Sequence, residues 1–265
     1  MRISISHRTT YSYETPVSYA LQRIRLRPSN SALQTVADWR VTVEGGRVET
    51  GYSDHHGNRV DLLSADAGTQ SLSITVAGEV DTHDRAGTLG KVYGRAPLWY
   101  WRQPTALTEA GTQITALIDG LEHQANEIDT LHALSAAIIA RVPYVLNQTG
   151  VETTAEQAVI QRSGVCQDHA NIFVSGARKL GMPARYVSGY LYMDDRVDQE
   201  ASHAWAEVHV DDLGWVGFDV SNGISPDPRY VRLAVGRDAQ EAAPISGLRM
   251  GSGDEQLIVS LQVQQ

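Results

Sequence analysis

The sequence predicts an α+β protein with a β-rich N-terminal domain over residues 1–95 and a mixed domain over residues 96–265. Three observations lead to this prediction. The chain has 265 residues, which corresponds to roughly two domains at the usual ~150 residues each. Apolar and polar residues alternate in short runs through the first part of the chain, as they do in strands. Further along, apolar residues recur at steps of three and four, as they do in helices.

The N-terminal domain is predicted to be a sandwich or a barrel. Ile3 and Ile5 alternate with polar residues, and similar runs occupy residues 39–43 and 72–76. Turn-forming residues such as those at 44–46 separate the runs. Because no helical pattern lies between them, these strands are expected to pack on one another rather than on helices.

A junction is predicted near residues 95–111, where prolines and aromatic residues interrupt any periodic pattern. The best-defined element after it is a helix that begins at Cys166. Gly181, which can adopt a positive φ, and Pro183, which cannot continue a helix, mark its end. The elements predicted after the junction are helices over 127–142, 153–162 and 166–180, and strands over 186–192, 203–210 and 215–220.

Charge and cysteine content disfavour or exclude several classes of partner and of structural site. The net charge of −9 disfavours nucleic acid and anionic membranes, because both repel a negative protein. The single cysteine, Cys166, excludes an intramolecular disulfide and a cysteine-based zinc cluster. No apolar run approaches the ~20 residues of a membrane helix, and the N-terminus lacks the apolar core of a secretory signal. We expect a cytoplasmic protein that needs no metal and no organic cofactor.

Cys166 lies where a thiol can become a nucleophile. The unpaired N–H groups and the dipole of a helix N-terminus stabilise an anion there, and Gly164 lets the backbone turn tightly enough to expose the sulfur. The alternative is a small buried apolar side chain, which is how most lone cysteines serve. A nearby base would distinguish the two.

His203 and Asp219 are the candidate base and orienting acid. His203 begins a predicted strand on which Ala204, Ala206 and Val208 face one way, so that His203 faces the other. Asp219 lies on the partner strand of the predicted hairpin. A four-residue hairpin loop would place Asp219 on the opposite face, whereas a loop of three or five residues, or one bulge, would place it beside His203. We therefore predict an odd-numbered loop and a Cys-His-Asp triad.

Four segments resemble the bacterial transglutaminase-like superfamily. They are Gly164-Val165-Cys166-Gln167-Asp168, Gly181-Met182-Pro183-Ala184-Arg185-Tyr186, Ser202-His203-Ala204-Trp205 and Gly214-Trp215-Val216-Gly217-Phe218-Asp219. Residues 1–95 similarly resemble the β-rich N-terminal region of these proteins. The resemblance implies a papain-like, transglutaminase-core catalytic domain, with Cys166 as nucleophile, His203 as base and Asp219 as orienting acid.

Several neighbouring residues admit more than one role. His169 could compete with His203 as the base, although the order of the triad favours His203, and Asp168 is expected to cap the helix or form an ion pair. An oxyanion hole would use the Cys166 backbone N–H and one side-chain donor. Gln161, Tyr144 and an indole, that of Trp205 among them, are candidates for substrate or oxyanion contacts, and ordinary packing is the alternative for each.

The predicted function is thiol-dependent acyl transfer at an amide bond of a peptide or protein substrate. Hydrolysis is favoured because water is the default acceptor of an acyl-enzyme. An amine acceptor would instead make the protein a protein-glutamine transglutaminase. A hypothesis of another class is a noncatalytic binding or scaffold module on the same fold, which the intact Cys166, His203 and Asp219 argue against. The sequence does not indicate the oligomeric state.

Overall fold

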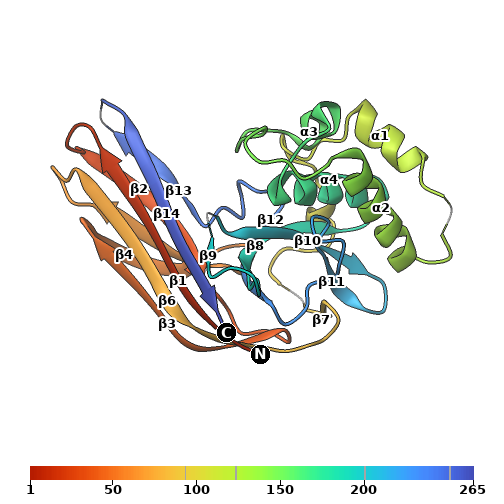
Figure 1. The fold of residues 1–265 in the computed structure, drawn as a ribbon, viewed down its shortest axis with the longest axis horizontal. Coiled ribbons are helices and arrows are strands. Elements are labelled where there is room, and N and C mark those ends of the chain that lie inside the picture. Colours follow the sequence, from red (N-terminus) through yellow and green to blue (C-terminus); the bar gives the residue numbers. More distant parts are fainter. Residues whose placement is uncertain (93, 123, 200, 251) are drawn as a thin grey trace.

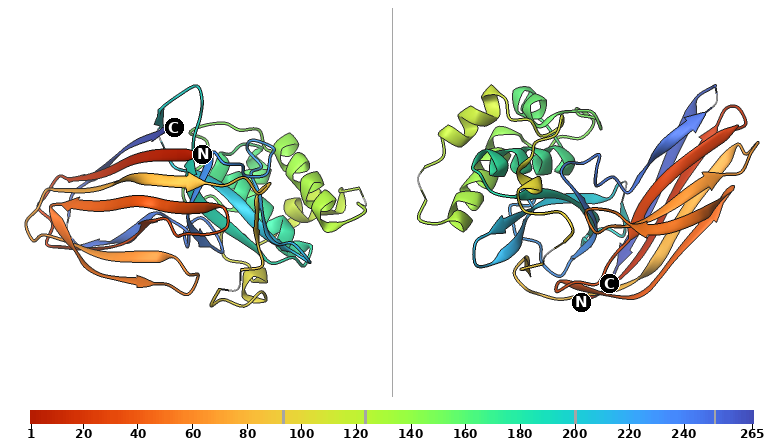
Figure 2. Two further views of the ribbon diagram at one scale, coloured as in Figure 1. Left: turned by 90° about the horizontal axis from the view of Figure 1, so that it is seen from below. Right: turned by 180° about the vertical axis from the view of Figure 1, so that it is seen from behind.

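A β-sandwich packs against an α/β unit in the computed structural model (Figure 1), which describes residues 1–265 except Tyr93, His123, Glu200 and Gly251. The chain begins and ends in the sandwich, and the two termini lie close together at one end of it (Figure 1). An antiparallel sheet of the α/β unit lies between the sandwich and the helices, as two further views show (Figure 2). The mixed architecture agrees with the predicted α+β class.

The sandwich consists of two antiparallel sheets. One has the strand order β3 (Gln34–Glu44), β6 (Ser71–Thr82), β1 (Arg2–Tyr13), β14 (Glu255–Gln264) and β9 (Asp198–Gln199). The other has the order β13 (Ile245–Met250), β2 (Tyr19–Arg27), β5 (Arg59–Ala65) and β4 (Gly46–Ser53). Alternation along β1 buries Ile3 and Ile5 in the core between the sheets, together with Leu63 and Leu72. This alternation confirms the period-two prediction for β1.

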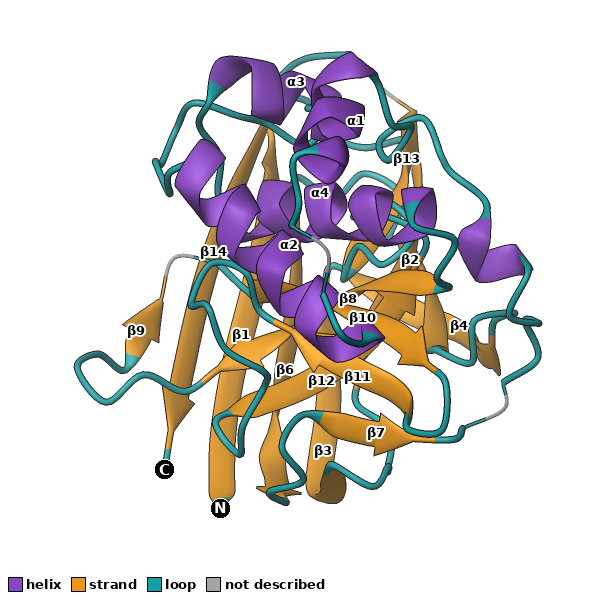
Figure 3. Ribbon diagram, turned by 90° about the vertical axis from the view of Figure 1, so that its right-hand side faces the viewer, coloured by secondary structure: helices purple, strands orange, loops and turns teal. Residues whose placement is uncertain are grey.

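The α/β unit is built on a third antiparallel sheet, with the order β12 (Tyr230–Gly236), β8 (Ala184–Leu191), β10 (His203–Val210), β11 (Gly214–Phe218) and β7 (Thr88–Gly90). Its helices gather on one side of the sheet (Figure 3). They are α1 (Thr112–Asp119), α2 (Glu127–Arg141), α3 (Ala155–Gln161) and α4 (Cys166–Lys179). The short helix η1 (Tyr100–Arg102) lies apart from them and packs Trp101 against Trp215. None of the helices in the described part of the chain is long and apolar enough to cross a membrane.

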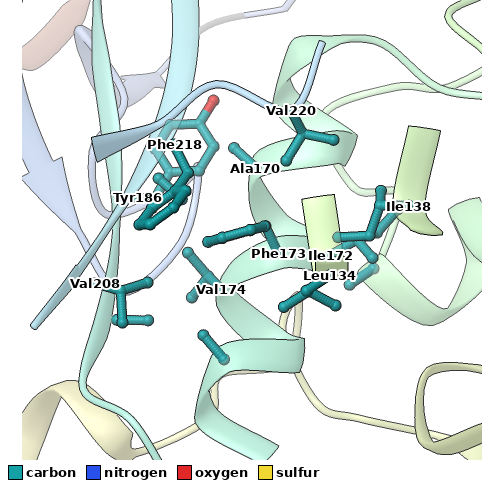
Figure 4. Packing of buried hydrophobic residues seen from close by; sticks show 14 of the residues in the cluster. Leu134, Ile138, Ala170, Ile172, Phe173, Val174, Tyr186, Val208, Phe218 and Val220 are labelled. Carbon is teal, nitrogen blue, oxygen red and sulfur yellow. The ribbon is translucent and has the colours of Figure 1, made fainter. Parts of the chain in front are cut away.

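Helix α4 forms the centre of the α/β core. Phe173 stacks on Phe218 of β11 with ring centroids 5.1 Å apart, and Leu134 and Ile138 of α2 pack on the helix as well (Figure 4). Gly181 follows α4 with a φ of 85°, which ends the helix where the sequence predicted. The helix is therefore held along its length, and its N-terminal residue Cys166 has a fixed position relative to the sheet.

Several strand pairings cross the predicted boundary between residues 95 and 96. β13 and β14, at the C-terminal end, return to the sandwich and pair with β2 and β1. β7, before the boundary, joins the sheet of the α/β unit. Tyr190 and Val231 of that sheet are buried in the same core cluster as the sandwich strands. The predicted boundary is based on local sequence patterns alone. The pairings join segments that are distant in the chain, which such patterns do not reveal.

Candidate active site

The backbone before α4 places Cys166 at the first residue of the helix. Arg162 ends α3 in the left-handed region with a φ of 55°, and Gly164 forms a bridge with Tyr144. A Cβ atom on Gly164 would lie only 2.7 Å from the Cβ of Asp168, so this position requires glycine. Cys166 is a free, half-buried thiol, and its N–H belongs to the first helical turn, where no intrahelical acceptor exists.

The β10–β11 hairpin positions His203 and Asp219. Val210 pairs with Gly214, which leaves residues 211–213 as a loop of three residues, the odd number predicted. The same register pairs Ala206 with Phe218, so Asp219 follows on the face of the hairpin to which His203 belongs. Asp212 and Gly214 adopt positive φ values of 67° and 79° in this turn.

Asp219 is directly hydrogen-bonded to His203. Nε2 of His203 lies 2.6 Å from Oδ2 of Asp219, and the carboxylate is 1% exposed. The same oxygen accepts hydrogen bonds of 2.7 Å from the Tyr230 hydroxyl and from the Asn222 side-chain amide. Burial alone would raise the pKa of Asp219, but these three donors and the charge of His203 lower it below its ordinary value. The carboxylate is therefore ionised at neutral pH.

The Cys166 thiol lies beside the imidazole of His203, close enough for a hydrogen bond to contribute to the pKa of the ring. Because Nε2 faces Asp219, Nδ1 is the nitrogen that remains for the sulfur. Burial lowers the pKa of His203, yet the hydrogen bonds to Asp219 and Cys166 and their negative charges outweigh it and raise the pKa to about 10. The ring is thus held as an imidazolium between two potential anions.

Aromatic rings cover His203. Trp205 is 3% exposed and stacks on the imidazole at a centroid distance of 6.3 Å and an interplanar angle of 29°. Tyr230 lies 5.9 Å from the imidazole on another side. Gly189 of β8 makes room for the indole, because a Cβ atom there would lie 2.5 Å from Trp205. The two rings keep bulk water from part of the hydrogen-bonded chain.

His169 is engaged in structural contacts and does not approach Asp219 in the way His203 does. One ring nitrogen lies 2.7 Å from the carbonyl oxygen of Val142, and the other lies 2.9 Å from the Ser221 hydroxyl. Burial lowers the pKa of His169. Asp168 caps α4 by accepting a 2.8 Å hydrogen bond from the N–H of Val165, as expected of an acid in the first turn.

The three residues predicted to contact substrate or an oxyanion lie in different places. Tyr144 is close enough to Cys166 for a thiolate there to help burial raise the pKa of the phenol, and the side chain is half exposed. Trp205 lies over His203 as described. Gln161 is the exposed last residue of α3, and neither Gln161 nor Tyr144 is among the described residues that line the cavity at Cys166. The structure thus leaves the Cys166 N–H and Tyr144 beside the thiol.

A cavity of about 450 Å³ opens onto Cys166 and His203. The α/β unit forms one side of it and strands β1 and β14 of the sandwich form the other. Within the described residues, no group of three or more His, Cys, Asp or Glu side chains is arranged to hold a metal ion.

The sequence does not indicate that Tyr230 and Asn222 are partners of Asp219. Asn222 belongs to the turn that follows Asp219, where an amide three residues after a carboxylate is a weak signal. Tyr230 is the first residue of β12. Because β12 pairs with β8 and not with β11, no local sequence pattern links Tyr230 to Asp219.

A half-buried thiol at a helix N-terminus beside a buried imidazole and carboxylate of an antiparallel sheet is typical of the cysteine-based catalytic class. Comparison with known families agrees with this. Residues 3–81 match the bacterial transglutaminase-like N-terminal region, and residues 115–220 match the transglutaminase-like superfamily. Together these matches span well over half of the chain, which belongs to the transglutaminase-like superfamily.

Two relatives and one solved structure are among the proteins similar to the chain. An uncharacterized protein of Mycobacterium leprae is 29% identical over 277 residues, covering 99% of this chain and 98% of its own length. A protein-glutamine gamma-glutamyltransferase of Pseudomonas aeruginosa is 26% identical over 147 residues, 47% of this chain and 22% of the relative. The fold matches that of a candidate cysteine protease from Cytophaga hutchinsonii with a TM-score of 0.80 at 22% identity, covering 100% of this chain and 90% of that one. The structural match shows that the fold extends over the whole chain.

Proposed function

We propose that the protein catalyses thiol-dependent acyl transfer at amide bonds and that its usual reaction is hydrolysis of a peptide or amide. The observation that carries the proposal is the hydrogen bond of His203 to buried Asp219, with the Cys166 thiol beside the same imidazole. A cytoplasmic location suits the one unpaired cysteine. Peptides or proteins are the proposed substrates.

Each step of the reaction has a group to perform it. The Cys166 sulfur attacks the carbonyl carbon, and the Cys166 N–H stabilises the oxyanion, with Tyr144 as its candidate partner. The C–N bond breaks as the imidazolium of His203 donates its proton to the leaving amine, which leaves a thioester. His203 then takes a proton from water, the hydroxide attacks the thioester, and Cys166 departs as the carboxylic acid forms.

Asp219 serves as the orienting acid. Its carboxylate holds Nε2 of His203 and so keeps Nδ1 directed at the sulfur. Tyr230 and Asn222 hold the carboxylate in turn, so the imidazole has a fixed orientation before substrate arrives. Trp205 shields the ring and limits the hydration of the ion pair.

A second candidate reaction is transfer to an amine. The relative from Pseudomonas aeruginosa named as a protein-glutamine gamma-glutamyltransferase favours it. Both reactions share the same acyl-enzyme, and they differ only in whether water or an amine attacks the thioester.

A peptide library incubated with the protein and read by mass spectrometry would distinguish the reactions. Cleavage at an internal amide indicates a peptidase, a gain of one dalton at glutamine indicates deamidation, and addition of a supplied alkylamine indicates transglutamination. The Cys166→Ala variant is the control, and none of the products should form with it. Reaction of wild-type Cys166 with iodoacetamide no faster than that of free cysteine would favour the noncatalytic scaffold instead.

A further inference from the structure

One wall of the cavity at Cys166 belongs to the sandwich rather than to the α/β unit. β1 contributes Thr9 and Tyr11 to this wall, and β14 contributes Leu257 and Val259. The register of the two strands pairs Thr9 with Val259 and Tyr11 with Leu257, so these side chains form one continuous patch on the inner face of the sheet. The core shared by the two units fixes this patch relative to Cys166.

Apart from the reacting pair, Cys166 and His203, the described lining of the cavity carries no charged side chain. Of the 21 described residues that line it, none is Asp, Glu, Lys or Arg, although these types make up 20% of the chain. His7 also lines the cavity, and burial lowers its pKa to about 4, so it is neutral at pH 7. Its ring nitrogens are taken by the Tyr190 and Thr9 hydroxyls, at 2.8 and 3.1 Å.

The wall is incompletely covered by the protein itself. Leu257 is 53% exposed although it lines the cavity, whereas Leu261 and Val263, further along the same face of β14, are buried. Apolar surface left open beside a nucleophile gains free energy when an apolar group of the substrate covers it. A charged group placed against this wall would lose hydration without meeting an Asp, Glu, Lys or Arg side chain of the described lining.

We propose that the patch of Thr9, Tyr11, Leu257 and Val259 is a substrate subsite that binds an uncharged, apolar side chain close to the scissile amide bond. This inference rests on the proposed function and deepens it. The sandwich then takes part in substrate selection, and peptides with an apolar residue near the reacting carbonyl are the preferred substrate class.

The experiment uses alkylation of Cys166 by three chloroacetamides of similar size, whose amide nitrogens carry a phenylethyl, a carboxylate or an ammonium tail. Intact-mass spectrometry gives the second-order rate constant for each, divided by that for iodoacetamide, which has no tail. We expect the phenylethyl probe to react about tenfold faster than either charged probe, as one well-placed apolar group commonly gives.

Leu257 and its neighbour Ile258 form a matched pair for mutation. They are 53% and 54% exposed, but alternation along β14 directs Leu257 into the cavity and Ile258 to the other face of the sheet. Leu257→Asp should abolish the preference for the phenylethyl probe and accelerate the ammonium probe about fivefold, as expected for a partly exposed ion pair. Ile258→Asp should leave all three ratios unchanged.

The outcomes separate this inference from the proposed function. If wild-type Cys166 reacts with iodoacetamide no faster than free cysteine, the proposed function fails. If Cys166 is highly reactive but all three tails react alike, or if both Asp variants change the ratios equally, the subsite is refuted and the triad stands. Leu257→Ser, which adds no charge, replaces Leu257→Asp if that variant does not fold, and it should likewise lower the phenylethyl preference.

Discussion

Removal of the Asp219 carboxylate should slow the reaction of Cys166, because it removes the acceptor and the negative charge 2.6 Å from Nε2 of His203. Burial lowers the pKa of His203, and the hydrogen bonds and charges of Asp219 and Cys166 raise it to about 10. A hydrogen bond to a charged group contributes about 1.5–3 kcal/mol. We take about 2.5 kcal/mol for Asp219, which corresponds to a factor between about 30 and 100 in rate.

Two substitutions at this position should differ in severity. Asp219→Ala removes both the charge and the acceptor, and the full 30- to 100-fold loss of about 2.5 kcal/mol is expected. In Asp219→Asn, the donors Tyr230 and Asn222 should hold the amide oxygen toward His203, because both already donate to Oδ2. The acceptor survives and only the charge is lost, so about a tenfold decrease is expected.

The assay is the second-order rate constant for iodoacetamide alkylation of Cys166 at pH 7, measured by intact mass. Asp119→Asn, at the exposed end of α1, is the control for loss of one negative charge and should react like the wild type. An Asp219→Ala rate within threefold of the wild type, in a protein of unchanged fold, would refute the reasoning.

Three other substitutions test the surroundings of the site. Tyr230→Phe removes one donor to Asp219 and should lower the alkylation rate of Cys166 a few-fold while lowering the free energy of unfolding by about 1 kcal/mol in urea titration. His169→Ala should lower the free energy of unfolding by about 1–3 kcal/mol, because the Val142 carbonyl loses its partner, yet leave the alkylation rate per folded molecule unchanged; a rate loss like that of His203→Ala would make His169 the base. Glu207→Gln should lower the free energy of unfolding by about 3–5 kcal/mol, since it leaves buried Arg185 without its carboxylate at 2.6 Å. The pKa of Glu207 is lowered in the fold, so its stabilisation is present above its unfolded pKa of about 4.3 and disappears as the pH falls through the folded value; a flat pH dependence between wild type and variant below pH 5 would contradict this.

The geometry of His203 and Asp219 could be predicted from the sequence because it depends on local rules. Alternation along β10 sets the face of His203, and the number of residues in the hairpin loop decides the face of Asp219. Glycine at position 164 and the helix that begins at Cys166 are also local features.

What the sequence did not predict depends on contacts between distant segments. β14 pairs with β1 across nearly the whole length of the chain, and a period-two pattern indicates a strand without naming its partner. The cavity wall at Leu257 and the contact of Tyr230 with Asp219 both follow from such pairings. For Trp205, packing and shielding were equal alternatives, and the indole does both, since it belongs to a buried cluster and stacks on His203.

The most direct test of the central claim is an NMR titration of the His203 ring nitrogens in the wild type and in Cys166→Ala. The account predicts that the wild-type imidazole remains protonated through neutral pH, consistent with a pKa of about 10, and that loss of the sulfur lowers this pKa. Titration of His203 near 6.5 in both proteins would contradict a ring held between a thiolate and a carboxylate.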